Sequence, residues 1–331
     1  MTGIALLGAG FMARTHAAVY ADLGDRAQVR VVCARSAEDA RPLAESLGAE
    51  IVTKWEAAIG AAGVDAVDIC LPTPLHRPVA ERALATGRHV LLEKPVALTL
   101  EDADAIGAAA AASETLLMVG QVLRYLPEVV ELRRVLATGE LGRPLAATAL
   151  RLSTPPDWNE WMLDADRSGG TLVDLMVHDF DLAGALLGPA RRVHARAAAG
   201  GRHVMALVEH EDGEAAVEGS HAMPGSFPFT AGMRVLCRRG VLDHRFEARA
   251  DDEGGNIGGG VTSVLRIHPA AGEVREFVGK GNPWGAQIER FLGCVEAGVE
   301  PEDGTVAQAR AALAVALAAR RSLVSGQPEP V

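Results

Sequence analysis

The sequence predicts an α/β fold with two domains, the first built on a parallel sheet and the second on a large, mostly antiparallel one. Three observations lead to this prediction. The chain has 331 residues, more than one hydrophobic core usually serves. Over about the first 120 residues, short β-branched segments alternate with helical patterns, as in successive βαβ units. Beyond about residue 122, longer strand-like segments follow one another with few helices between them.

In the N-terminal half, strands are expected to alternate with helices. The strands are predicted at residues 3–7, 29–34, 66–71, 89–93 and 116–119, and the helices at residues 14–23, 38–47, 55–61, 78–85 and 100–112. The last of these helices follows Thr99, with Asp102 three residues later, a pattern close to a capping box. Helices of this length suit the crossover connections that parallel strands require.

The C-terminal half is predicted to begin with a helix at residues 128–137 and a strand at residues 144–152. Further strands are expected at residues 191–197, 204–210, 214–221, 229–237, 241–247 and 261–268, and helices at 284–297 and 305–324. Turns at Asp212-Gly213 and Arg239-Gly240 favour antiparallel hairpins. The glycine-rich stretch 254–260 is interpreted as a flexible hairpin end. We predict that residues 1–121 form the first domain and residues 122–331 the second.

Composition and charge favour a globular protein that acts on a small molecule. Hydrophobic residues make up 49% of the chain and charged residues 23%. The formal net charge is -11, and lysines and arginines do not cluster. Because phosphate binding depends on clustered cations, this charge argues against nucleic acid or an anionic membrane as a partner.

The cysteines and the apolar segments favour a cytoplasmic protein. Cys33, Cys70, Cys237 and Cys294 lie far apart and form no CxxC pair, so they indicate neither a zinc site nor a disulfide framework. No metal ligands are predicted. The apolar run at residues 4–7 lacks a basic leader and a cleavage site and is interpreted as a strand. Polar residues interrupt the alanine-rich segment 306–323, which is therefore interpreted as a helix of a soluble protein.

The segment Gly8-Ala9-Gly10-Phe11-Met12-Ala13 follows the first predicted strand and opens a helix. This is the context that the dinucleotide-binding fingerprint requires, with alanine accepted at the third position. The two glycines permit a tight turn and close approach of the backbone to a pyrophosphate, and the helix N-terminus offers unpaired N–H groups. The sequence therefore predicts a dinucleotide site at this turn.

The end of the second strand favours NADP over NAD. An acidic residue at this point normally binds the adenosine ribose hydroxyls, but this chain has Arg35 and Ser36 here and no acid before Glu38. The Arg35 guanidinium and the Ser36 hydroxyl could both bind a 2'-phosphate. The alternative is that Arg35 is simply an exposed loop residue.

Two further loops are expected at the carboxyl edge of the parallel sheet, where ligands bind in open α/β folds. After the strand at 66–71, the stretch Pro72-Thr73-Pro74-Leu75-His76 forms a rigid loop that either follows the cofactor or only ends the strand and caps the next helix. After the strand at 89–93 come Lys94 and Pro95. A lysine that faces a nicotinamide cation is expected to have a lowered pKa, which suits proton transfer between an alcohol and a ketone.

In the C-terminal half, Gly169-Gly170 precede a helical pattern in which Asp174, His178 and Asp181 are spaced i, i+4 and i+7. On one helix these three side chains would share a face. A carboxylate one turn from an imidazole can fix its tautomer and raise its basicity, as a proton-transferring group requires. A surface helix with its acids toward solvent is the alternative.

The order of these motifs resembles the Gfo/Idh/MocA family of NAD(P)-dependent oxidoreductases. The resemblance spans essentially the whole chain and includes Val119-Gly120-Gln121, Arg124 at the domain junction and Asp303-Gly304 before the last helix. It implies an N-terminal Rossmann domain with a parallel sheet, followed by a C-terminal α/β domain with a large, open, mostly antiparallel sheet whose outer face often forms homodimers or homotetramers. It also implies hydride exchange between NAD(P) and a sugar, inositol or related cyclic polyol.

Site residues follow from these motifs and from the resemblance. The predicted catalytic residues are Lys94, Asp174 and His178. The predicted cofactor-binding residues are Gly8, Gly10, Phe11, Met12, Ala13, Arg35, Ser36, Leu71, Pro72, Thr73, His76, Glu93, Lys94 and Gln121. The predicted substrate-binding residues are Lys94, Arg124, Trp158, Trp161, Asp174 and His178. For Arg124 a structural ion pair is the alternative, and for the two tryptophans it is packing at an interface.

The chemistry assigns roles to the three catalytic candidates. Removing a hydride from a secondary alcohol yields a carbonyl only if the hydroxyl proton also leaves, so a positioned base is needed. We expect His178, held by Asp174, to transfer that proton while Lys94 hydrogen-bonds the same oxygen; the reverse assignment of His178 and Lys94 is the alternative. Asp181 is expected to support the site, and Asp179 to point away from the shared face.

The chain departs from the family pattern at a few positions. Ser168 and Met176 stand where many relatives have glycine, and Leu71 stands where a small hydroxyl residue is frequent. Met162 falls where relatives often have an arginine, so one polar substrate contact is expected to be missing. None of these departures removes a proposed catalytic group.

Two other functions fit the same scaffold. The first is a dehydrogenase of a non-sugar substrate, such as a dihydrodiol or an imine. The second is a regulatory protein that binds NAD(P) and a sugar without turnover. The joint presence of Lys94, Asp174 and His178 argues against the regulatory protein.

Overall fold

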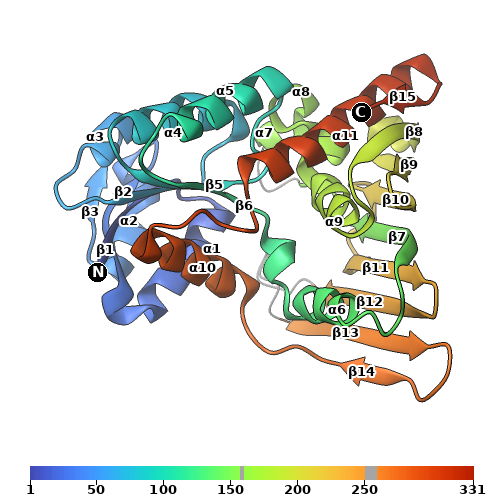
Figure 1. Cartoon of the computed structure of the whole chain (residues 1–331). Helices are drawn as coiled ribbons and strands as arrows, with labels where there is room; N and C mark the ends of the chain where they lie inside the picture. Colours follow the sequence, from blue (N-terminus) through green and yellow to red (C-terminus); the bar gives the residue numbers. More distant parts are fainter. Residues whose placement is uncertain (157–159, 250–258) are drawn as a thin grey trace. The chain divides into compact units, whose positions relative to one another are not determined.

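The computed structural model describes residues 1–156, 160–249 and 259–331 (Figure 1). These residues form two compact units. The first unit comprises Met1–Val122 and Asn282–Arg310, and the second comprises Leu123–Gly281 and Ala311–Val331. Each unit thus combines two separate stretches of the chain. The predicted domain boundary between residues 121 and 122 stays a prediction.

The first unit contains a six-stranded parallel sheet with the order β3-β2-β1-β4-β5-β6. Its strands are β1 (Thr2–Leu7), β2 (Ala27–Cys33), β3 (Glu50–Val52), β4 (Ala66–Ile69), β5 (His89–Glu93) and β6 (Leu117–Gly120). Its helices are α1 (Phe11–Asp22), α2 (Ala37–Leu47), α3 (Trp55–Ile59), α4 (His76–Ala85), α5 (Leu100–Ala111) and α10 (Pro283–Ala297). The predicted parallel sheet is confirmed.

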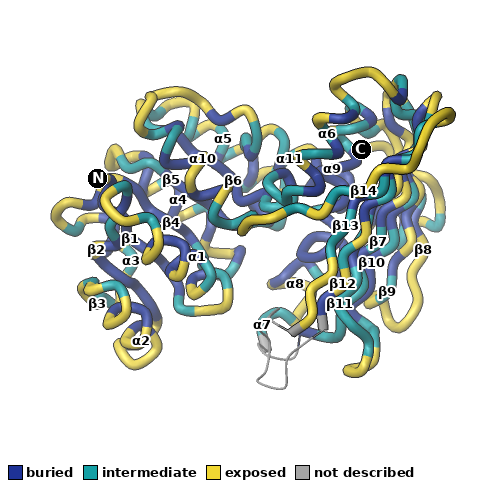
Figure 2. The backbone as a smooth tube through the Cα atoms, turned by 90° about the horizontal axis from the view of Figure 1, so that it is seen from below, coloured by how far each residue is buried: buried dark blue, intermediate teal, exposed yellow. Residues whose placement is uncertain are grey.

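Helices cover both faces of this sheet, with α1 beside α10 and α4 beside α5 (Figure 1). The central strands are therefore buried on both sides, and all six residues of β1 are buried (Figure 2). The predicted cap of α5 is confirmed, because Thr99 Oγ1 accepts a hydrogen bond of 3.1 Å from the Asp102 N–H. Among the strands of this sheet, only β3 was not predicted, since it has only three residues.

The second unit contains a nine-stranded sheet with the order β14-β13-β12-β11-β7-β10-β9-β8-β15. Its strands are β7 (Pro144–Leu152), β8 (Ala190–Ala198), β9 (His203–His210), β10 (Glu214–Ser220), β11 (Phe229–Cys237), β12 (Gly240–Arg249), β13 (Gly259–Pro269), β14 (Arg275–Phe277) and β15 (Glu329–Pro330). β7 and β10 pair in parallel, whereas the other recorded pairs of this sheet are antiparallel. The predicted mostly antiparallel sheet is confirmed.

Helices of the second unit lie against one face of this sheet. They include α6 (Pro127–Ala137), α7 (Glu160–Leu163), α8 (Ala165–Ser168), α9 (Val177–Leu187) and most of α11 (Val306–Ser325). α9 packs on β7 and β10, and α6 packs on β12 and β13. Along β9, buried residues alternate with exposed ones such as Met205 and Leu207, so the strand has one face toward the core and one toward solvent (Figure 2).

Two further predictions concern the loops and the apolar segments. The glycine-rich stretch 254–260 lies mostly outside the described residues, so its role as a hairpin end stays a prediction. None of the helices in the described part of the chain combines the length and the apolar character needed to cross a membrane.

Candidate active site

The glycine turn after β1 has the geometry that a pyrophosphate requires. Gly8 has a φ of 124°, and a Cβ added there would lie 2.4 Å from the carbonyl oxygen of Cys70. Gly10 is the N-cap of α1, where no side chain bonds the first N–H groups, and the space around its Cβ position is open to 4 Å. The first turn of α1 also contains no acid. The helix N-terminus thus fits an anionic group, as the fingerprint predicts.

The remaining residues of this turn differ in exposure. Phe11 is exposed, Met12 is half-buried and Ala13 is fully buried beneath the helix. A small residue at the third fingerprint position allows close packing between helix and sheet. Ala13 meets that requirement.

Arg35 and Ser36 follow β2. Arg35 is exposed. Ser36 is the N-cap of α2: its Oγ accepts from the Asp39 N–H at 3.1 Å and donates to Asp39 Oδ2 at 2.8 Å. The Ser36 hydroxyl is therefore engaged in capping and would have to turn from Asp39 to donate to a phosphate.

The loop after β4 is tied to the loop after β5 by His76. Leu71 and Pro72 are half-buried and Thr73 is buried. The His76 ring is buried, with Nδ1 2.9 Å from the Pro95 carbonyl oxygen and Nε2 2.9 Å from that of Leu71. Burial lowers the pKa of His76. The ring thus lies between two neighbouring strand ends, and as a neutral imidazole it donates its one N–H to one of these two carbonyl oxygens.

Glu93 and Lys94 lie at the end of β5. Glu93 is buried, and its Oε2 accepts a hydrogen bond of 3.1 Å from the Lys94 backbone N–H. Lys94 is half-buried, and its peptide bond to Pro95 is cis. Gln121, just beyond β6, is also buried. Gly8 and Lys94 thus follow β1 and β5 of the same parallel sheet, at its carboxyl edge.

A buried polar cluster, which we did not predict from the sequence, connects α1 with β4 and β5. His16 of α1 is completely buried, and its Nδ1 is 2.8 Å from Asp68 Oδ2. The Tyr20 hydroxyl donates to the same oxygen at 2.9 Å, and the Cys70 thiol donates to Asp68 Oδ1 at 3.4 Å. His16 Nε2 lies 3.4 Å from Glu93 Oε1. The only sequence signal for this cluster was a histidine on an otherwise apolar helix face.

His16, Asp68 and Cys70 also place ligand-type atoms within 4.8 Å of one another. Two ligands of one tetrahedral zinc ion, each about 2.0–2.3 Å from the metal, lie roughly 3.3 Å or more apart. The 2.8 Å between His16 Nδ1 and Asp68 Oδ2 is instead a hydrogen-bond distance. Burial raises the pKa of the Cys70 thiol far above its usual range, which keeps it protonated. The geometry is that of a hydrogen-bonded cluster.

In the second unit, Asp174 lies in a π-helical turn. Gly169 and Gly170 have φ values of 87° and 61°, and a Cβ at Gly169 would lie 2.4 Å from the Val173 Cβ. The turn then spans Thr171–Leu175, and the Met176 N–H donates to the Thr171 carbonyl five residues earlier. The regular α-helical spacing assumed from the sequence therefore applies to His178 and Asp181 but not to Asp174.

α9 carries His178 and is held by two buried ion pairs. Asp181 forms a bidentate pair with Arg124 at 2.7 and 2.8 Å. Asp179 forms another with Arg151 of β7 at 2.9 Å for both bonds. Asp179 thus points into the unit, toward the sheet. His178 itself is half-buried.

A second histidine, missed from the sequence, lies near Asp174. His221 follows β10 directly and is buried, with Nε2 3.9 Å from Asp174 Oδ2. Its position after a strand end was the only available signal. Met176, one of the departures from the family pattern, is fully buried against Gly219 of β10, where a Cβ would lie 2.2 Å from the Met176 side chain.

The segment before Gly169 contains the two tryptophans that we predicted to bind substrate. Trp158 lies outside the described residues. Trp161 is half-buried at α7, next to Met162. Ser168 is buried and bonds within its own turn, donating to the Asp164 carbonyl at 3.0 Å and accepting from the Gly170 N–H at 3.1 Å.

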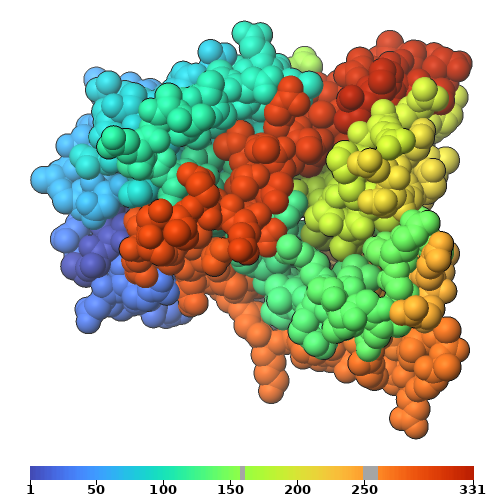
Figure 3. Space-filling model, viewed as in Figure 1, coloured from blue at the N-terminus to red at the C-terminus, as the bar shows by residue number. Residues whose placement is uncertain are grey.

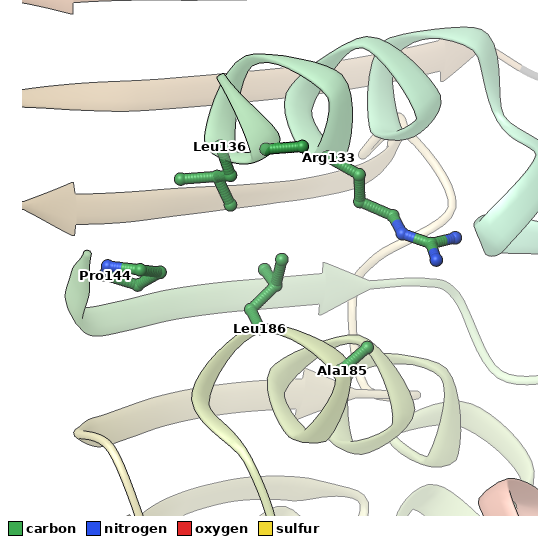
Figure 4. Close-up of a pocket in the computed structure, with 6 residues that line it drawn as sticks. Arg133, Leu136, Pro144, Ala185 and Leu186 are labelled. Carbon is green, nitrogen blue, oxygen red and sulfur yellow. The ribbon is translucent and has the colours of Figure 1, made fainter. Parts of the chain in front are cut away.

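A surface depression of about 310 Å³ lies between α6 and α9, over the start of β7. Both helices face the viewer in Figure 3, and Figure 4 shows the side chains. It is lined by Arg133, Leu136, Ala137, Pro144, Ala185 and Leu186. A ligand site usually combines apolar walls with several convergent polar groups, but Arg133 is the only polar side chain in this lining and no candidate site residue belongs to it.

The parallel sheet and the glycine turn between β1 and α1 define a protein of the Rossmann class, whose fold binds dinucleotides. Comparison with known proteins gives the family. Residues 2–121 match the Gfo/Idh/MocA oxidoreductase family, NAD-binding Rossmann fold, and residues 129–243 match the Gfo/Idh/MocA C-terminal domain. The chain belongs to the Gfo/Idh/MocA family, so the resemblance seen in the sequence is confirmed.

Curated relatives share part of their length with this chain. The 1,5-anhydro-D-fructose reductase of Ensifer adhaerens is 37% identical over 39% of this chain and 40% of its own length. The inositol 2-dehydrogenase of Rhizobium meliloti (strain 1021) is 34% identical over 55% of this chain and 54% of its own length. The chain thus spans about half the length of these relatives, or less.

Solved structures match over nearly the whole chain. The UDP-N-acetylglucosamine 3-dehydrogenase of Acidithiobacillus ferrooxidans has 27% identity and a TM-score of 0.79, with 98% of both chains covered. The aldose-aldose oxidoreductase of Caulobacter crescentus has 22% identity and a TM-score of 0.84, covering 100% of this chain and 99% of the other, a likeness of fold.

Proposed function

We propose that the protein is an NAD(P)-dependent dehydrogenase or reductase that acts on a CH–OH group of a sugar, inositol or related cyclic polyol. The observation that carries this proposal is the position of Lys94 after β5, on the same sheet edge as the glycine turn after β1. A dinucleotide held at that turn has its reactive end along this edge. Curated relatives named as inositol and sugar oxidoreductases support the substrate class.

The chain's own residues supply binding and proton transfer. NAD(P) accepts or provides the hydride when bound. The open N-terminus of α1 after Gly10 binds the pyrophosphate through its N–H groups. Lys94 hydrogen-bonds the substrate oxygen and stabilises the charge that develops there. His178 takes or gives the hydroxyl proton, and the Asp174 carboxylate orients the His178 ring for this transfer.

Substitution of Lys94 or His178 tests these roles. We expect Lys94→Ala and His178→Asn each to lower kcat by about 100- to 10,000-fold, the usual contribution of a positioned acid or base. Both should lower kcat far more than they weaken cofactor binding, with Kd measured by fluorescence titration. A matched control is His268→Asn on β13, which should retain activity. Wild-type kcat in either active-site variant would refute its role.

NADP preference is the finer part of the proposal. It is supported by exposed Arg35 after β2 and by the absence of an acid at that strand end. The engagement of Ser36 with Asp39 leaves Arg35 as the main candidate for a 2'-phosphate. Michaelis constants for the two cofactors decide: we expect a lower KM for NADP, and Arg35→Ala should remove the difference. A lower KM for NAD in the wild type would contradict this preference.

A homo-oligomer formed through the outer face of the nine-stranded sheet is also part of the proposal. That face exposes Met205 and Leu207 on β9 and Leu236 on β11. Light scattering in solution should give a mass of two or four chains, and Leu207→Glu should lower it; a monomeric wild type would refute this state.

The four cysteines are free, in keeping with the cytoplasmic location that we infer.

A further inference from the structure

The buried cluster around His16 extends from α1 to the strand end that carries Lys94. His16 and Asp68 are buried, and the short contact between them is reinforced by the donors of Tyr20 and Cys70 on the same carboxylate. Asp68 therefore accepts three hydrogen bonds and has its charge satisfied within the first unit. The second ring nitrogen of His16, Nε2, makes no hydrogen bond among the described residues, but it lies within ion-pair distance, 3.4 Å, of Glu93 Oε1.

His16 carries a positive charge in this environment. Burial has the largest single effect and lowers its pKa, but Asp68 and Cys70 together outweigh burial and raise the pKa well above 6.5. Both ring nitrogens then bear protons. The imidazolium stands between two carboxylates, bonded to Asp68 and facing Glu93.

Residues from several elements of the first unit surround the Glu93 carboxylate. Its Oε2 accepts from the Lys94 N–H, and its Oε1 faces His16. A Cβ added to Gly120 of β6 would lie 3.0 Å from Glu93 Oε1 and 3.4 Å from Gln287 Nε2 of α10. The carboxylate thus occupies space that exists because residue 120 is a glycine. Gln287 is completely buried, and its amide atoms have no hydrogen-bond partner among the described residues.

We propose that His16 is a positioning residue for the reaction: it holds the Glu93 carboxylate, which through the Lys94 N–H fixes the backbone from which the Lys94 side chain extends. The proposal rests on the role proposed above for Lys94. It extends the site to a residue that touches neither substrate nor cofactor. His16 therefore acts on kcat and not on cofactor affinity, because a small displacement of a group at the reacting centre is enough to slow the chemistry.

Two substitutions of His16 separate its two contacts. In His16→Asn, the amide nitrogen replaces Nδ1 and keeps the bond to Asp68 but loses Glu93. In His16→Gln, the amide nitrogen replaces Nε2 and keeps Glu93 but loses Asp68. We expect His16→Asn to keep a near-native Tm and to lower kcat by about 10- to 100-fold. His16→Gln should lose stability and keep more kcat than His16→Asn. If His16 had a purely structural role, kcat would be lower in His16→Gln than in His16→Asn.

Gly120→Ala perturbs the same carboxylate from the opposite side. Its methyl group would lie 3.0 Å from Glu93 Oε1, so the carboxylate must shift. We expect a similar loss of kcat with an unchanged Kd for the cofactor. The matched control is Gly107→Ala on α5, where the nearest atom is an ordinary 3.5 Å contact with Val306, and it should retain wild-type kcat.

A second measurement requires no substrate. The lysines of the chain are Lys54, Lys94 and Lys280. Limited acetylation, followed by peptide mass spectrometry, gives the modification rate of Lys94 relative to exposed Lys54 in the same molecule. His16→Asn and Gly120→Ala should each change this ratio at least about twofold, and Gly107→Ala should not, because only the first two displace Glu93.

The outcomes distinguish the two proposals. If Lys94→Ala is inactive while His16→Asn and Gly120→Ala keep wild-type kcat and the wild-type labelling ratio, the positioning role of His16 is wrong and the proposed function stands. If Lys94→Ala itself keeps wild-type kcat, the role of Lys94 is wrong, and the inference for His16 falls with it. Loss of kcat in both variants with a changed labelling ratio supports the inference.

Discussion

At the scale of single residues, two buried histidines of this protein are held in different charge states by their surroundings. The pKa of His16 is raised because the adjacent Asp68 and Cys70 together outweigh the lowering effect of burial. His244 of β12 is also buried, but its Nε2 hydrogen-bonds the neutral Ser263 hydroxyl at 3.2 Å. Burial therefore lowers the pKa of His244 to about 4. One ring is a cation in the folded protein and the other is neutral near pH 7.

His244 should make stability fall with acidity. Its pKa is about 4 when folded and about 6.5 in an unfolded chain, so the unfolded state binds more protons between these values. Stability linked to neutral His244 is complete above pH of about 6.5 and is lost as pH falls toward 4. Thermal unfolding at several pH values should show that His244→Gln loses less Tm than the wild type over this range. Equal losses would contradict this account.

The stability linked to His16 changes with pH in the opposite direction. Its raised folded pKa means that its stabilisation is complete below the unfolded value of about 6.5 and is lost as pH rises through the folded value. In the same unfolding experiment, the difference in Tm between wild type and His16→Gln, which loses the contact with Asp68, should therefore narrow above neutral pH. Opposite trends for the two histidines would exclude a general effect of net charge.

At the scale of elements, α9 is fixed to its unit by buried charge pairs rather than by apolar packing alone. Arg151 of β7 and Asp179 are both buried and make two parallel hydrogen bonds. Burial raises the pKa of Asp179, and Arg151 only partly offsets this. Because desolvation offsets much of the attraction within a buried ion pair, we expect this pair to specify where α9 docks more than it adds stability.

Breaking and replacing this pair should have different effects. Asp179→Leu alone leaves a buried guanidinium and should lower the free energy of unfolding by about 3–5 kcal/mol. The double variant Arg151→Met, Asp179→Leu should recover most of this loss, since no charge then remains buried. The matched control is Glu211→Ala, which removes the exposed pair with Arg191 and should cost at most about 1 kcal/mol. Denaturant unfolding measures all three. A double variant as unstable as the single one would contradict this explanation.

Some elements of the fold have local sequence signals, and others depend on contacts with distant residues. Alternating burial in β9 and the capping pattern at Thr99 are local signals, and the structure contains both elements. The π-helical turn around Asp174 was not predicted, because it depends on the positive φ of Gly169 and Gly170 and on packing against β10. An i, i+4 pattern in sequence is compatible with either helix, so Asp174 and His178 appeared to share one regular helix.

At the scale of the whole molecule, the order of motifs along the chain was enough to predict the family and both sheets. What it could not reveal were side-chain partners that depend on distant segments. His16 and Asp68 are 52 residues apart, and Arg124 and Asp181 are 57 apart. The association of α10 with the first unit has the same origin, because it depends on the contact of α10 with α1 rather than on local sequence.

The most direct test of the central claim is transfer of the carbon-bound hydrogen itself. The purified chain is incubated with NAD or NADP and a panel of inositols and aldoses that carry deuterium at their carbinol carbons, and the reduced cofactor is analysed by mass spectrometry. We predict that deuterium appears in the reduced nicotinamide with at least one polyol, and that Lys94→Ala abolishes the transfer. Tight cofactor binding without deuterium transfer to the nicotinamide from any member of the panel would contradict the account.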